Sequence, residues 1–79
     1  MTAELPEHEI TLDARGLEPP EPLELVLEAL SALERHQRLR MLIDREPRPL
    51  YPILDNNNFS YLASTTADFR YEILIWHKD

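Results

Sequence analysis

Alternation of apolar and polar residues predicts four strands in this chain, each with one buried face. They cover residues 9–14, 38–44, 59–66 and 69–77, and the last shows the clearest alternation. The side chains expected to face the core are Ile10, Leu12 and Ala14 in the first strand, Leu39, Met41 and Ile43 in the second, and Tyr71, Ile73 and Ile75 in the last.

Helical spacing predicts a helix from about Pro20 to Leu33 or Glu34, and Pro20 and Pro22 suit its first turn. At about 100° per residue, its apolar residues gather on one stripe. That stripe contains Leu23, Val26, Leu27, Ala29, Leu30 and Leu33. A second, short helix begins near Pro49 and should end at the three asparagines 56–58, which tolerate the left-handed conformation.

The resulting order is β-α-β-α-β-β, in which the first helix connects two parallel strands. Two helices cannot cover both faces of a four-stranded sheet in a chain of 79 residues. We therefore expect an α/β (α+β) two-layer sandwich with a mixed sheet and both helices on one face. We expect residues 1–8 to form an acidic N-terminal tail and residues 9–79 to form a single domain.

The uncovered sheet face should show both charged and apolar side chains. Its expected members are Thr11, Asp13, Arg40, Leu42, Glu72, Leu74 and Trp76, with Asp13 and Arg40 as a cross-strand ion pair. Leu74 and Trp76 leave an apolar patch. We expect a monomer, or a weak homodimer through this face.

The composition excludes several kinds of chemistry. The chain has no cysteine, which removes disulfides, thiolate nucleophiles and cysteine metal sites. Its net charge of −7 should repel polyanions, so nucleic acid is not expected as a partner. We see neither a targeting signal nor a membrane span, and we expect a cytoplasmic protein.

The most informative stretch joins the first strand to the first helix, at residues 12–23. It contains the only glycine, Gly16, where a positive φ would help the chain turn. The loops of residues 15–22 and 44–51 should meet outside the carboxyl ends of the parallel strands, a common ligand site in α/β sheets. The candidate binding residues there are Arg15, Gly16, Glu18, Pro19, Pro20, Glu21, Pro22, Arg45, Glu46, Arg48 and Tyr51.

The three histidines, His8, His36 and His77, should gather at the opposite end of the sheet. Converging imidazoles can bind a transition metal. Their spacing forms no recognised ligand motif, so we assign neither a metal nor a cofactor.

The run Leu12-Asp13-Ala14-Arg15-Gly16-Leu17-Glu18-Pro19-Pro20-Glu21-Pro22-Leu23 resembles the signature of the TusA/SirA-like sulfur-carrier family, Leu-Asp-x-x-Gly-Leu followed by Cys-Pro-x-Pro. The resemblance implies a fold related to the C-terminal domain of translation initiation factor three, with sheet order 1-2-4-3. Pro19 occupies the place of the persulfide-carrying cysteine. Proline offers no nucleophile, which excludes sulfur relay by that mechanism.

The segments Glu18-Pro19-Pro20-Glu21-Pro22 and Arg45-Glu46-Pro47-x-Pro49-Leu50-Tyr51-Pro52 resemble a cysteine-lacking branch of these proteins, a domain of unknown function. We expect a binding or accessory module rather than an enzyme, docking a protein partner or a small ligand through the two loops. The resemblance leaves two alternatives: a metal- or haem-linked redox accessory in nitrogen-oxide metabolism, and an RNA-linked role related to tRNA sulfur modification.

Overall fold

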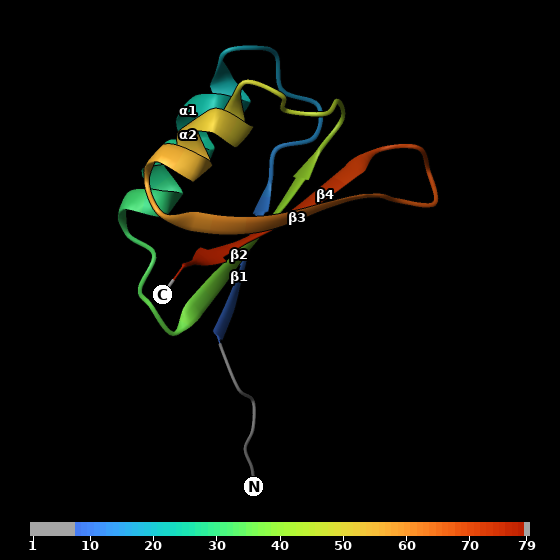
Figure 1. Cartoon of the computed structure of the whole chain (residues 1–79). Helices are drawn as coiled ribbons and strands as arrows, with labels where there is room; N and C mark the ends of the chain where they lie inside the picture. The colour runs from blue at the N-terminus through green and yellow to red at the C-terminus, as the bar shows by residue number, and fades with distance from the viewer. Residues whose placement is uncertain (1–7, 79) are drawn as a thin grey trace, which may run out of the picture.

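The computed structural model of the protein describes residues 8–78. The expected acidic tail therefore lies, apart from His8, outside the described residues. The elements are β1 (His8–Asp13), α1 (Glu21–Ser31), β2 (Gln37–Ile43), α2 (Leu50–Asn56), β3 (Phe59–Thr65) and β4 (Tyr71–His77). This is the predicted order, and Figure 1 shows its course. No helix within residues 8–78 combines the length and apolarity needed to cross a bilayer.

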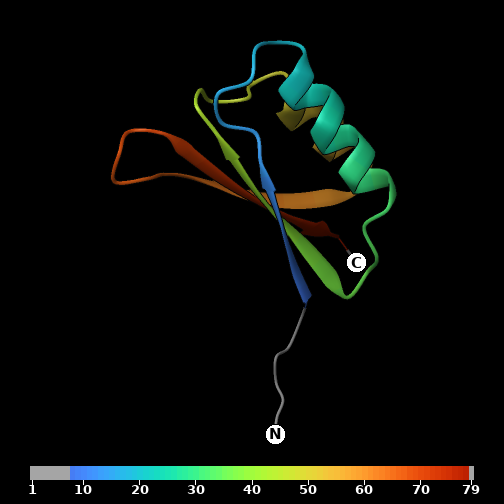
Figure 2. The same ribbon diagram turned by 180° about the vertical axis from the view of Figure 1, so that it is seen from behind.

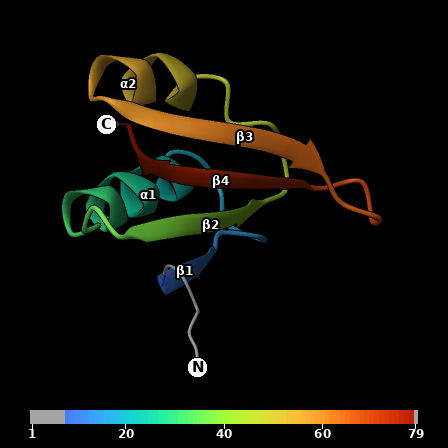
Figure 3. The same ribbon diagram turned by 60° about the horizontal axis from the view of Figure 1, so that its bottom comes forward.

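The four strands form one mixed sheet in the order β1-β2-β4-β3. β1 pairs with β2 in parallel, whereas β4 pairs antiparallel with both β2 and β3. The order can be followed from strand to strand in Figure 3. Both helices lie on the same face of the sheet (Figures 1 and 2). The predicted fold class and strand order are confirmed.

The core lies between the two central strands and the two helices. Alternate residues of β2 and β4 point toward the helices, as the period of two requires. The sheet contributes Leu39, Met41, Ile73 and Ile75 to this core, and the helices contribute Val26, Leu30, Leu50 and Leu54. The predicted inward faces of β2 and β4 are correct.

Helix α1 is shorter than predicted and buries a narrower stripe. It ends at Ser31, where the amides of Ala32 and Leu33 donate to carbonyls three residues back, which tightens the last turn. Leu33 remains buried beyond the helix end, but Leu27 is 37% exposed. Leu27 lies beside the gap between α1 and α2, because the short second helix does not close over it.

Strand β1 is more exposed than its alternating pattern predicted. Ile10 is 40% exposed, although Leu12 packs partly on the core and Ala14 is buried just after the strand. β1 is exposed because it is an edge strand and because α1 packs on the neighbouring strand β2.

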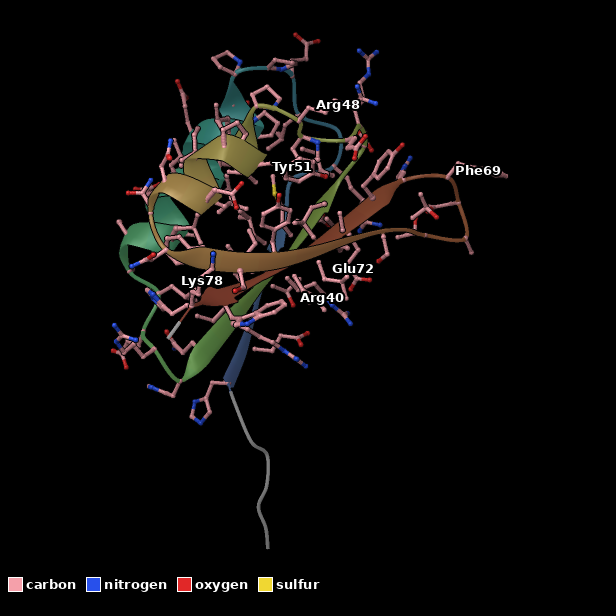
Figure 4. The ribbon with its side chains drawn as sticks, in the orientation of Figure 1. Arg40, Arg48, Tyr51, Phe69, Glu72 and Lys78 are labelled. Atoms are coloured by element: carbon pink, nitrogen blue, oxygen red, sulfur yellow. The ribbon has the colours of Figure 1, made fainter. Side chains whose placement is uncertain are left out.

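The turn between β3 and β4 is longer than predicted, so β4 begins at Tyr71 and not at Phe69. Thr66 N–H donates to the Arg70 carbonyl (2.8 Å), and Arg70 N–H donates to the Thr66 hydroxyl (3.1 Å). These bonds close the turn and leave Phe69 at its tip, with φ of 66° and 90% exposure. The hairpin projects beyond the helices, and Phe69 points away from the body (Figure 4).

The uncovered face has the expected side chains but not the expected ion pair. The register places Arg40 opposite Thr11, and its guanidinium pairs with Glu9 and Glu72 (Figure 4). Asp13 instead accepts two hydrogen bonds from the Arg15 side chain, both 2.8 Å long. The predicted Asp13–Arg40 pair is therefore wrong.

Candidate functional site

The two loops that precede the helices meet, as predicted, and Asp44 holds them together. Gly16 turns the first loop with φ of +80°, and its N–H donates to Asp44 Oδ2 over 2.7 Å. Apart from its two chain neighbours, no residue has a heavy atom within 4 Å of the position where a side chain would begin on Gly16, so its backbone conformation alone calls for glycine. Asp44 Oδ1 lies 3.2 Å from Arg70 Nε, at an ion-pair distance. Asp44 therefore links both loops to the β3–β4 hairpin.

Proline shapes the entrance to α1. Pro20 is the N-cap and Pro22 is the second helical residue, a position where the missing N–H breaks no helical hydrogen bond. The Pro19–Pro20 peptide bond is cis. Glu21 N–H donates to the Glu18 carbonyl (2.9 Å), which closes the turn before the helix. The loop therefore presents proline rings and carbonyl groups with few free N–H donors.

An apolar groove of about 320 Å³ lies between the two loops, and we call it the proline groove. It is lined by Pro19, Pro20, Pro22, Leu23, Met41, Ile43, Arg45, Glu46, Pro47, Pro49 and Leu50. Five of the seven prolines of the chain are among these residues. A wider hollow of about 600 Å³ adjoins it and shares Pro19, Pro22, Ile43 and Arg45.

The carboxylate of Glu46 is already engaged. Arg48 Nε donates to its Oε1 and Tyr51 Oη donates to its Oε2, each over 3.2 Å. Tyr51 also stacks on Tyr61, with ring centroids 4.9 Å apart. Burial, reinforced by the Glu46 carboxylate, raises the pKa of Tyr51 to about 12. The tyrosine therefore stays protonated and keeps Glu46 in place at neutral pH.

The arginines near the groove differ in their partners. Arg15 forms a bidentate pair with Asp13, which raises the pKa of Arg15 and lowers that of Asp13 to about 2. Arg48 is paired with Glu46. Arg45 lines the groove, and among residues 8–78 no carboxylate lies within ion-pair distance of it.

The structure brings together part of the predicted site. Pro19, Pro20, Pro22, Arg45 and Glu46 line the proline groove, and Gly16 and Glu18 line the adjoining hollow. Tyr51 and Arg48 reach the site only through Glu46, and Arg15 and Glu21 line neither cavity.

The three histidines lie at the predicted end of the sheet, but their rings do not converge on one point. The rings of His8 and His36 meet edge to face, with centroids 5.3 Å apart. His77 instead has Nε2 2.8 Å from the Leu33 carbonyl and its ring beside Phe59, so it links the end of α1 to β4. Within the described part of the chain, no three side chains of His, Cys, Asp or Glu are grouped to hold a metal ion.

Sequence reasoning missed Asp44 and Phe69. The alternation puts Asp44 at the end of a strand, and its link to Gly16 spans 28 residues, which no local pattern reveals. Phe69 fits the alternation of the last strand, so the pattern predicts it there. Thr66 and Asp68 do predict a turn at residues 66–68, since short polar side chains often close turns, but they do not show that it extends through Phe69 to Arg70.

A mixed sheet in the order β1-β2-β4-β3, with both helices on one face, defines a small two-layer α+β domain. The chain belongs to the DUF2249 family of uncharacterized conserved proteins, whose family model matches residues 11–77. No curated protein and no solved structure matches it. The match confirms membership of a family of unknown function, and it carries no link to the sulfur carriers.

Proposed function

We propose that the protein is a non-enzymatic binding module whose site is the proline groove. It docks a protein partner or a small ligand through the loops of residues 15–22 and 44–51. The observation that carries this proposal is the apolar groove of about 320 Å³ where both helices begin. Preformed apolar clefts with few polar groups are the usual form of ligand sites, and this end of an α/β sheet is their usual place.

The chemistry of the lining supports binding rather than catalysis. Among the described residues that line it, the only ionisable side chains are Arg45 and Glu46, and both carboxylate oxygens of Glu46 accept hydrogen bonds from the protein. A nucleophile needs an adjacent base, and a general base needs a reacting proton within hydrogen-bond reach. The described residues that line the groove offer no hydroxyl, thiol, amine or imidazole as a nucleophile, and Glu46 is held by Arg48 and Tyr51.

The proposed module descends from a sulfur-carrier-like fold and works in the cytoplasm. The strand order β1-β2-β4-β3 is the one that the resemblance implied, which supports the relationship. Pro19, at the position of the carrier cysteine, lines the groove. In this proposal, Pro19 lines a binding site at the position where the carriers have their cysteine.

The two alternatives receive less support. A metal- or haem-linked role has only the His8–His36 pair, because His77 is engaged elsewhere. An RNA-linked role would have to overcome a net charge of −7.

The test is a proton–nitrogen correlation spectrum of the labelled full chain, titrated with a panel of small-molecule fragments. We expect saturable shifts at the amides of Leu23, Arg45, Glu46 and Leu50, since the groove prolines have no N–H. Leu62, on the uncovered sheet face, serves as an internal control. Shifts confined to that face or to His8 and His36, or no saturable shift at the groove, would contradict the proposed site.

A further inference from the structure

Arg45 stands out among the arginines of the described chain. Arg15, Arg38, Arg40, Arg48 and Arg70 each lie beside a carboxylate, and Arg35 also has an interaction partner. Arg45 has no carboxylate partner there, although the protein contains 15 acidic residues against eight basic ones. Arg45 is exposed and lines the groove, so its guanidinium can accept a partner from outside the described chain.

The remaining walls of the proline groove cannot satisfy a polar ligand. Five prolines contribute no N–H donor, and the rest of the surface comes from Leu23, Met41, Ile43 and Leu50. A polar group pressed against these walls would lose its water without gaining a partner, which is unfavourable. The part of a ligand that lies in the groove should therefore be apolar.

The charge around the groove further restricts the ligand. Glu46 contributes a negative charge that Arg48 only partly offsets, because Arg48 is mostly exposed to solvent. A second negative charge on the ligand would be repelled by Glu46. A single carboxylate matches the planar guanidinium fork, which binds it through two parallel hydrogen bonds.

We propose that the proline groove binds a small apolar monocarboxylate, with the carboxylate on Arg45 and the apolar body against the prolines. This inference rests on the proposed function and adds the class of ligand. The volume of about 320 Å³ lies at the lower end of small-molecule sites. It suits one aromatic ring or a short alkyl chain.

The experiment compares three probes on the labelled full chain. 4-Phenylbutyrate carries both the ring and the carboxylate, 4-phenylbutanamide has the same shape without the charge, and acetate has the charge without the ring. We expect saturable shifts at Arg45, Glu46 and Leu50 with 4-phenylbutyrate. The amide should bind at least tenfold more weakly, and acetate should cause no saturable shift.

Two variants, each of which removes one positive charge, distinguish a direct contact with the ligand carboxylate from a general effect of net charge. Arg45→Ala should weaken 4-phenylbutyrate binding at least tenfold. Lys78→Ala should leave the affinity within twofold, because Lys78 lies far from the Arg48 and Tyr51 side of the molecule (Figure 4). The dispersion of each spectrum verifies that the variant is folded.

Several outcomes would overturn the inference. Equal binding of the acid and the amide, or unchanged binding by Arg45→Ala, would show that no carboxylate is recognised. Binding of the peptide Ala-Ala-Phe with a free C-terminus, without binding of 4-phenylbutyrate, would identify a peptide terminus as the ligand. If all the acids fail while neutral fragments still shift the groove amides, the ligand class is wrong and the proposed function stands. If nothing shifts these amides, both fail.

Discussion

Phe69 adopts a backbone conformation that its side chain disfavours. Its φ of 66° lies in the left-handed region, where a side chain meets the following carbonyl. The ring is 90% exposed, so its packing contributes little free energy to offset this steric cost. The surrounding turn maintains the conformation, because Phe69 N–H donates to the Thr66 carbonyl (3.1 Å) and the Thr66 hydroxyl contacts Asp68.

We predict that Phe69→Gly is more stable than Phe69→Ala by about 1 kcal/mol. Both substitutions remove the ring, but only glycine adopts a positive φ without a steric cost. Urea unfolding of the two variants, followed by circular dichroism, measures the difference. Equal stability would mean that the turn relaxes into another conformation.

At the scale of elements, α2 is held by aromatic and polar contacts as well as by its buried leucines. Tyr51, in its first turn, stacks on Tyr61 of β3 and donates to Glu46 in the loop before the helix. These contacts join the groove to the far edge of the sheet. Helix α2 has only seven residues, so tertiary packing and not helix propensity must stabilise it.

This arrangement predicts a loss of stability in alkali. The folded pKa of Tyr51, about 12, lies above the ordinary value of 10.0. The unfolded chain therefore loses this proton first as the pH rises. The stabilising contribution is complete below about pH 10 and disappears between about pH 10 and 12.

Comparison with Tyr51→Phe isolates the contribution of Tyr51 ionisation to stability, because phenylalanine keeps the ring and cannot ionise. The stability of the wild type relative to the variant, measured by urea unfolding, should fall as the pH rises from 10 to 12. Parallel curves for the two proteins would show that Tyr51 titrates normally in the folded state.

At the scale of the whole molecule, one sheet face lies uncovered by the helices. Leu62 on β3 is 58% exposed and lies opposite Leu74, next to Trp76. Arg40 and Glu72 form the charged half of the same face. A second copy could cover the apolar half, which is the origin of the expected weak homodimer.

We predict a monomer at micromolar concentration that self-associates weakly at higher concentration. Leu62→Lys should abolish this association, because a charge would be buried in the contact. Ala63→Lys, which adds the same charge on the opposite side of β3, should not. Sedimentation equilibrium over a concentration series measures both variants, and association that persists in Leu62→Lys would place the contact elsewhere.

The element order, the inward faces of β2 and β4 and the meeting of the two loops were predictable from the sequence. These features follow from local properties: a hydrophobic period of two or 3.6, the φ of proline, and asparagines and a glycine where the chain must turn. Asn58 and Gly16 indeed have positive φ. Strand order came only through the resemblance, since no local pattern encodes it.

The tertiary structure alone decided which side chains meet. Asp13 pairs with Arg15 and not with Arg40, because the strand register places Arg40 opposite Thr11. His77 bonds to Leu33 and leaves His8 and His36 as a pair. The prolines were evident in the sequence, but the groove they form depends on how two distant loops pack, as does Arg45, which has no carboxylate partner among residues 8–78. Sequence periodicity specifies faces, whereas a site requires distances between residues far apart in the chain.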